Sequence, residues 1–148
     1  LALELVARGH RLVADDAPVF AKTSPDTLSG RCPEILRDFL EVRGLGILNI
    51  RAMFGDSAIK QARNLRLVLR LVAMNEEQIH AIDRLHGART TQTILGVEIP
   101  EITLPVAPGR NLAVLAEAAA RNHALLRKGF DSAKLFMERQ TRFMENNS

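Results

Sequence analysis

The segment from Leu65 to Val72 places the strongest single constraint on the fold. Leucines at 65, 67, 69 and 71 alternate with Arg66, Val68 and Arg70, which is the pattern of a half-buried strand. A helical pattern occurs later in the chain, where the residues from Asn111 to Lys128 form a strong helical segment. Asn111 is a suitable N-cap for this helix, and Gly129 follows its end. The chain is therefore expected to combine strands with helices.

Weaker patterns indicate further elements and one long loop. The polar stretch from Asn75 to Thr93 has no clear period and is predicted to be a long mobile loop. The first helix has a stop signal but no start signal, so we expect it to begin before Leu1 and interpret the chain as a fragment. The other expected elements are a helix over Leu1–Arg8 ended by Gly9, a strand over His10–Ala14, an extended piece over Pro18–Lys22, a helix within Pro33–Phe39, a strand over Ile99–Val106 and a last helix capped by Asp131, with Phe136 and Phe143 on one face.

Composition narrows the classes of function. With 148 residues, of which 47% are apolar, the chain is expected to be one domain covering residues 1–148. It has no Trp or Tyr to stack on bases, so nucleic acid is not an expected partner. The lone Cys32 allows no internal disulfide, and the four histidines lack zinc-ligand spacing. No apolar run of about 18 residues occurs, so we expect no membrane span and a cytoplasmic location.

An acidic pair, Asp15 and Asp16, closes the strand predicted over His10–Ala14. The ends of strands line the crevices where nucleotide enzymes bind ligands, and neighbouring side chains on a strand point to opposite faces. One carboxylate could therefore face metal-bound phosphates while the other points elsewhere. On spacing alone, a solvated turn that opens a hairpin is the more common explanation of the same two residues.

Three other segments have an ordinary structural interpretation when each is taken alone. Gly44 and Gly46 break both periodicities and allow a close approach of the backbone, and the nearby Glu41 then resembles an exposed acid at a helix end. Arg84 alone is a surface arginine. The segment Pro105–Arg110 alone is a turn from a strand into a helix.

Taken together, four segments resemble the HPr kinase/phosphorylases, in the order of that family. Residues Leu3–Asp16 resemble the stretch that follows the family's Walker A loop, and Asp83-Arg84-Leu85 resembles its conserved loop. Residues Pro105–Val114 resemble a later loop and helix. The resemblance to the family's signature motif covers Leu40, Glu41, Val42, Arg43, Gly44, Leu45, Gly46, Ile47, Leu48 and Asn49, and the resemblance to its dephosphorylation region covers Pro105, Val106, Ala107, Pro108, Gly109 and Arg110.

The resemblance implies a role for each position. Asp16 would take the proton from the target serine hydroxyl and return it in the reverse reaction, and Asp15 would support the metal or orient its neighbour. Glu41 would be a ligand of Mg²⁺. Arg84 would offset charge on the transferred phosphoryl group, and Pro105–Arg110 would serve dephosphorylation with inorganic phosphate.

For the whole protein, the resemblance implies an α/β fold of the P-loop, phosphoenolpyruvate-carboxykinase-like type, with a central mixed sheet and flanking helices. It implies ATP or pyrophosphate as phosphate donor, Mg²⁺ as cofactor, the serine of HPr as target, and a homohexamer that holds HPr through the last helix. The chain departs from the family because no Walker A loop of the Gly-x-x-Gly-x-Gly-Lys-Ser kind occurs in it. The chain alone is therefore expected to be inactive. A small-molecule kinase or carboxykinase relative and a non-catalytic interaction fragment remain as alternatives.

Overall fold

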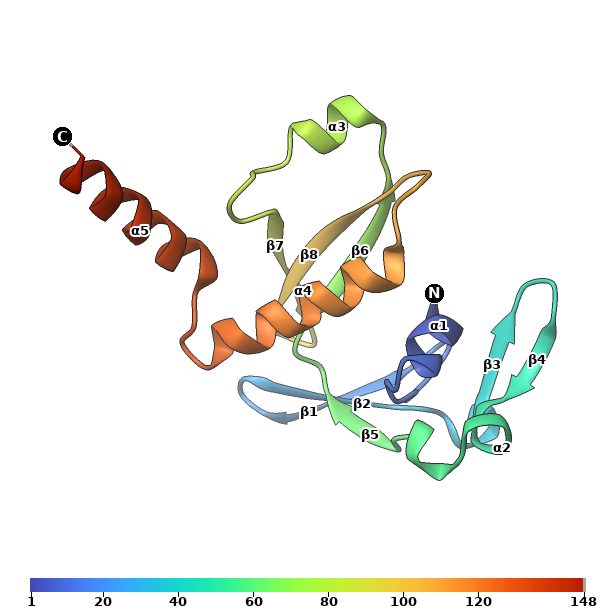
Figure 1. Cartoon of the computed structure of the whole chain (residues 1–148). Coiled ribbons are helices and arrows are strands. Elements are labelled where there is room, and N and C mark those ends of the chain that lie inside the picture. The colour runs from blue at the N-terminus through green and yellow to red at the C-terminus, as the bar shows by residue number, and fades with distance from the viewer. Residues whose placement is uncertain (148) are drawn as a thin grey trace. The chain divides into compact units, whose positions relative to one another are not determined.

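The computed structural model describes residues 1–147 and consists of two compact units. The first unit contains Leu1–Val68 and Thr91–Pro100, and the second contains Leu69–Thr90 and the residues from Glu101 onward. The elements in chain order (Figure 1) are α1 (Ala2–Ala7), β1 (Val19–Ser24), β2 (Thr27–Arg31), a 3-10 turn (Glu34–Leu36), β3 (Phe39–Val42), β4 (Gly46–Asn49), α2 (Ile50–Phe54), a second 3-10 turn (Asp56–Ala58), β5 (Ala62–Asn64), β6 (Val68–Ala73), α3 (Glu76–His80), β7 (Ala88–Ile94), β8 (Val97–Val106), α4 (Leu112–Arg127) and α5 (Ser132–Asn146).

Helix α1 confirms the first predicted helix, including its end. Gly9 adopts a positive φ of 98°, and the backbone N–H of His10 donates to the carbonyl of Leu5 across 3.0 Å. This is the Schellman arrangement that a glycine permits after a helix. One face of α1 contributes to the core of the first unit, whose buried members are Val6, Leu12, Leu40, Ile50 and Ala58.

Two predictions between α1 and β3 are wrong. The strand predicted over His10–Ala14 is reduced to one isolated parallel bridge between Leu12 and Ile59, because the chain bends directly after the bridge. The helix predicted within Pro33–Phe39 stops after one 3-10 turn, since Asp38 adopts a φ of 73° and directs the chain into β3.

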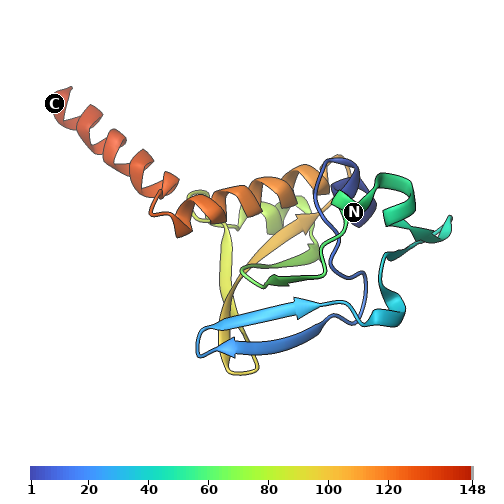
Figure 2. The ribbon, with the colours of Figure 1, turned by 90° about the horizontal axis from the view of Figure 1, so that it is seen from below.

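An antiparallel sheet with the strand order β1-β2-β5 forms the other half of the first unit. Strands β1 and β2 lie side by side as a hairpin (Figure 2), which confirms the extended piece over Pro18–Lys22. Position 30 on β2 suits glycine, because a Cβ there would lie 2.9 Å from the ring of Phe20. The buried apolar residues of this half are Leu28, Val97 and Ile99.

The second unit contains most of the sheet with the order β6-β8-β7. The backbone N–H of Met74, directly after β6, donates to the carbonyl of Val106 across 3.1 Å, so β6 and β8 end side by side as a parallel pair does. Strands β7 and β8 are instead joined by a tight turn at Leu95 and Gly96. The sheet is therefore mixed, as expected, but it is one of three small sheets rather than a single central sheet.

Helices α4 and α5 confirm the predicted caps. The Asn111 side chain accepts a hydrogen bond from the N–H of Val114, and the Asp131 side chain accepts one from that of Lys134. Helix α5 buries none of its residues, and Phe136 and Phe143 keep 52% and 70% of their surface exposed. Within residues 1–147 no helix has the length and apolar character that a membrane span requires.

The predicted long loop over Asn75–Thr93 is largely ordered, and that prediction is wrong. Asn75 and Gln78 form a capping box that starts α3, with hydrogen bonds of 2.8 and 2.9 Å. Strand β7 begins at Ala88, so the loop is confined to residues 81–87. Both elements are short and polar, which is why neither produced a periodic signal.

Candidate functional site

The resemblance to the signature motif falls on one antiparallel hairpin, β3–β4. Leu40 pairs with Leu48, and Glu41 pairs with Ile47. Because side chains alternate across a strand, Leu40 enters the core at 2% exposure while Ile47 on the other face remains 72% exposed. Glu41 lies on the same solvent face as Ile47. The carboxylate of Glu41 is therefore held on a strand rather than at a helix end.

The two glycines of this hairpin are required by backbone conformation. Gly44 and Gly46 have φ values of 94° and 96°, which L side chains rarely adopt. A Cβ at either position would have open space around it, so the close backbone approach expected from the sequence is wrong. The turn closes through a hydrogen bond of 2.9 Å from the N–H of Leu45 to the carbonyl of Val42.

The acidic pair lies beside this hairpin. Oδ2 of Asp15 accepts a hydrogen bond of 2.9 Å from the backbone N–H of Glu41, although the two residues are 26 positions apart. Asp16 instead accepts from the N–H of its neighbour Ala17, also across 2.9 Å. Both aspartates and Glu41 are exposed. The structure thus brings together three of the residues that the resemblance singled out.

This carboxylate group fits Mg²⁺ bound to a phosphate, but not a closed metal cage. Among residues 1–147 no three His, Cys, Asp or Glu side chains converge as a complete metal site. Mg²⁺ usually takes one or two protein carboxylates and completes its shell with water and phosphate oxygens. Asp15 and Glu41 supply the hard oxygen donors that such a partial site needs.

An ion-pair group at the base of the hairpin was not predicted from the sequence. The Nε of Arg51 on α2 donates to Asp38 across 3.0 Å, and its Nη1 donates to Asp56 across 3.2 Å. The hydrogen bonds that Arg51 donates to Asp38 and, second, to Asp56 raise the pKa of its guanidinium above the ordinary value. This group fixes the start of β3 against α2. Only the positive φ of Asp38 marks it, and no sequence pattern signals that conformation for an aspartate.

In the second unit, Arg84 lies on the ordered loop between α3 and β7. Oδ1 of Asp83 accepts hydrogen bonds from the N–H groups of Leu85 and His86, at 2.8 and 2.9 Å. The bond from His86, followed by that from Leu85, lowers the pKa of the Asp83 carboxyl. Arg89 adds a bond of 2.7 Å from its Nε to the carbonyl of His86. The loop therefore has a defined shape and presents Arg84 to solvent.

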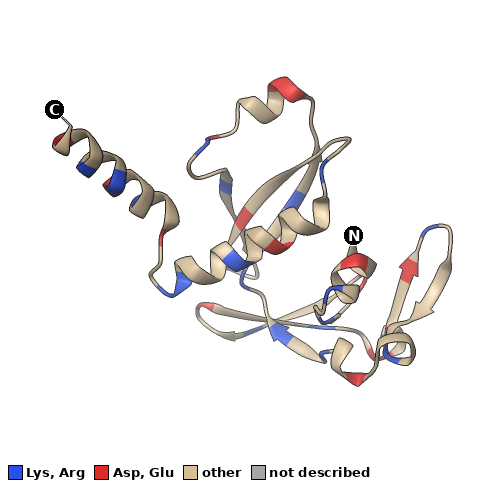
Figure 3. Cartoon of the chain, in the orientation of Figure 1, with Lys and Arg blue, Asp and Glu red and all other residues tan. Residues whose placement is uncertain are grey.

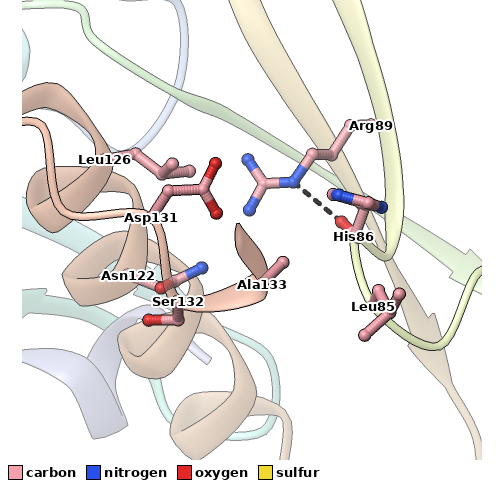
Figure 4. A pocket seen from close by; sticks show the side chains of 8 residues that line it. All are labelled: Leu85, His86, Arg89, Asn122, Leu126, Asp131, Ser132 and Ala133. Carbon is pink, nitrogen blue, oxygen red and sulfur yellow. Dashed lines mark hydrogen bonds between the residues drawn. The ribbon is translucent and has the colours of Figure 1, made fainter. Parts of the chain in front are cut away.

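Two small hollows flank this loop within the second unit. One, of about 210 Å³, is bounded by residues of the loop, α4 and the start of α5; the guanidinium of Arg89 faces the carboxylate of Asp131 across it (Figure 4). The other is lined by Arg84, Leu85, Phe136 and Gln140. The side chain of Arg84 thus lies next to the apolar face of α5.

The segment Pro105–Arg110 joins β8 to α4 in the same unit. Pro105 and Val106 end the strand, and the N–H of Arg110 donates to the carbonyl of Ala107 across 3.3 Å. Gly109 has a φ of 80°. The segment is thus a turn that leads into the N-terminus of a long helix, as predicted.

Acidic and basic residues are spread over both units (Figure 3), so no single charged face dominates the described chain.

The fold defines a mixed α/β protein, and its β3–β4 hairpin and the adjoining acidic pair carry exposed carboxylates, a type of oxygen donor that Mg²⁺ takes in proteins. The chain belongs to the family of the HPr serine kinase C-terminal domain, whose profile matches residues 1–140.

Individual relatives support the same family. The chain is 54% identical over 146 residues to the HPr kinase/phosphorylase of Chromobacterium violaceum and 56% identical over 146 residues to that of Xylella fastidiosa strain M12. These matches cover 99% and 98% of the chain but only 46% of each relative, so the chain spans less than half the length of these proteins. The solved structure of the Hpr(Ser) kinase/phosphatase from Coxiella burnetii matches with a TM-score of 0.78 and 35% identity, over 91% of this chain and 81% of that one.

Proposed function

We propose that this chain forms the greater part of the catalytic domain of an enzyme that phosphorylates a serine of HPr and removes the phosphate again with inorganic phosphate. The observation that carries the proposal is the contact between Asp15 and the backbone of Glu41. It gathers at one hairpin the acidic pair and the signature glutamate, two motifs that sequence analysis could only treat separately.

Within this site Asp16 is the proton acceptor. Its carboxylate is exposed and bonded only to the adjacent N–H of Ala17 in the described chain, so it can reach a serine hydroxyl that approaches from solvent. Asp15 and Glu41 would hold Mg²⁺, which supplies positive charge to the phosphate oxygens during transfer. In the reverse direction Asp16 returns the proton to the departing serine oxygen.

Two segments of the second unit take their proposed roles from the family resemblance alone. The Arg84 guanidinium, presented by its ordered loop, would offset negative charge on the transferring group. The turn at Pro105–Arg110 opens α4, and the first N–H groups of a helix of 16 residues favour an anion. This turn would take the inorganic phosphate of the reverse reaction.

The finer family properties belong to the same proposal. They are the P-loop, phosphoenolpyruvate-carboxykinase-like fold type, use of ATP or pyrophosphate, a homohexamer and a cytoplasmic location. The printed sequence contains no Walker A loop, so residues outside it would hold the nucleotide phosphates, and the chain alone would not transfer phosphate.

Asp16→Asn tests the proposal. The assay follows transfer of phosphate from ATP to purified HPr, and phosphorolysis of phosphoseryl-HPr, by the chain carrying a Walker A loop ahead of Leu1. We expect both rates to fall by roughly 10²- to 10⁴-fold, because both need the same proton transfer. Asp26→Asn, a change at an exposed β-turn, is the matched control and should leave both rates unchanged. Full activity of Asp16→Asn would refute the assignment, and transfer to a small molecule but not to HPr would support a small-molecule kinase instead.

A further inference from the structure

We propose that a hollow in the first unit, lined by the cationic side chains of Arg11, Arg51 and Lys60, binds a small oxyanion of the phosphate class. The hollow has a volume of about 510 Å³ and is completed by Ile59, Gln61 and Ala62. None of these residues has a role in the proposed chemistry at Asp15, Asp16 and Glu41. The inference therefore stands independently of the proposed function.

The backbone fixes Arg11 and Lys60 on the same face. Leu12 forms a parallel bridge with Ile59, secured by hydrogen bonds of 2.8 Å from Leu12 to Ala58 and 3.0 Å from Lys60 to Leu12. Leu12 is buried in the core. Residues next to a bridged pair point away from the face that the pair occupies. Arg11 precedes one partner and Lys60 follows the other, so both side chains leave the core face together.

The charges in the hollow are only partly balanced. Arg51 is held by Asp38 and Asp56, which compensate much of its charge and fix the plane of its guanidinium. Within residues 1–147, neither Arg11 nor Lys60 has an acidic partner. Two uncompensated cations beside a fixed guanidinium favour an anion with two negative charges.

The donor types narrow the ligand class. A guanidinium binds phosphate through paired N–H groups, a lysine adds a point charge, and the Gln61 amide offers further donors. The walls contain no aromatic side chain that could hold a base or a sugar ring. The hollow is open to water, so we expect weak, salt-sensitive binding with a Kd on the order of 1 mM.

The test is an amide NMR titration of the full chain at constant ionic strength. One arm uses inorganic phosphate, a second uses pyrophosphate, and a third uses a phosphoserine peptide, so that the tightest arm identifies the source of the phosphate group. We expect saturable shifts at Arg11, Leu12, Lys60 and Gln61 in at least one arm. Sodium chloride at matched ionic strength should not reproduce them.

Variants separate this site from other anion sites. The double variant Arg11→Gln/Lys60→Gln should raise the Kd at least tenfold, whereas Arg11→Lys should retain binding and shows that loss of charge is the cause. Arg121→Gln, on the exposed surface of α4, is the matched control and should bind as the parent chain does. Shifts that are absent, that chloride reproduces, or that persist in a folded double variant would overturn the proposal.

Discussion

The carboxylate of Asp15 accepts a hydrogen bond of 2.9 Å from the backbone N–H of Glu41, not from its side chain. Two residues 26 positions apart are thereby joined while the carboxylate of Glu41 remains exposed. A carboxylate that anchors its neighbour through the main chain brings a second carboxylate close without placing the two negative charges in direct contact.

Replacing Asp15 by alanine should affect both stability and metal use. Removal of one hydrogen-bond acceptor is expected to lower the free energy of unfolding by about 1 kcal/mol. Loss of one carboxylate should also raise the Mg²⁺ concentration needed for half-maximal transfer by about tenfold or more. Urea unfolding measures the first effect, and a Mg²⁺ titration of the phosphotransfer rate of the chain carrying a Walker A loop ahead of Leu1 measures the second. Asp15→Asn keeps an acceptor oxygen, so its free energy of unfolding should match that of the parent chain while its Mg²⁺ requirement stays raised. A Mg²⁺ requirement that also returned to the parent value would contradict the role of the charge.

Replacing Arg84 by alanine should lower kcat with little change in stability. The side chain is exposed, and the hydrogen bonds that order its loop come from Asp83 and Arg89. Loss of one group that stabilises transition-state charge typically costs about 10²- to 10³-fold. Steady-state kinetics on HPr with the chain carrying a Walker A loop ahead of Leu1 give the value, with Arg63→Ala on β5 as an exposed control. An effect confined to KM for HPr would show that Arg84 binds the partner rather than the phosphoryl group.

The hairpin should depend on one buried residue beneath it. Ile50 has no exposed surface, and Ile50→Ala is expected to lower the free energy of unfolding by about 2 to 5 kcal/mol. Ile47 is 72% exposed on the outer face, and Ile47→Ala should change it by less than about 0.5 kcal/mol. Denaturant titrations of both variants test this difference. Equal effects would mean that the hairpin does not pack as described.

The loop that carries Arg84 should loosen in acid. Hydrogen bonds from His86 and then Leu85 lower the folded-state pKa of Asp83 below its ordinary 3.8. A depressed pKa contributes stability that is present above the ordinary value and is lost as the pH falls through the folded-state value. The amide signals of Leu85 and His86 should therefore move only below about pH 3.8. In Asp83→Asn this titration should disappear, whereas Asp26→Asn should leave it intact. A midpoint above 3.8 would contradict the assigned hydrogen bonds.

Local chemistry made parts of the fold predictable. Asn111 and Asp131 cap α4 and α5 as expected, and Gly9 ends α1, because each signal is contained within a few residues. The predicted loop over Asn75–Thr93 failed for the opposite reason. Helix α3 has only 5 residues and β7 is polar on both faces, so neither presents an apolar period.

The site was predictable only in pieces. Asp15, Asp16 and Glu41 were singled out by resemblance, but the hydrogen bond that joins Asp15 to Glu41 depends on tertiary packing. The ion pairs of Arg51 were missed because partners 13 and 5 positions away follow no helical or strand spacing. The roles of Asp15, Asp16, Glu41, Arg84 and Pro105–Arg110 remain predictions.

The pairing of β3 with β4 determines the direction in which the Glu41 carboxylate points. Leu40 enters the core and Glu41 leaves it only because Leu40 faces Leu48 across the ladder. A shift of one residue in the register of β3 and β4 would expose Leu40 to water and bury the Glu41 side chain in the apolar core. Burial of the Leu40 side chain thus keeps the Glu41 carboxylate on the solvent face of β3.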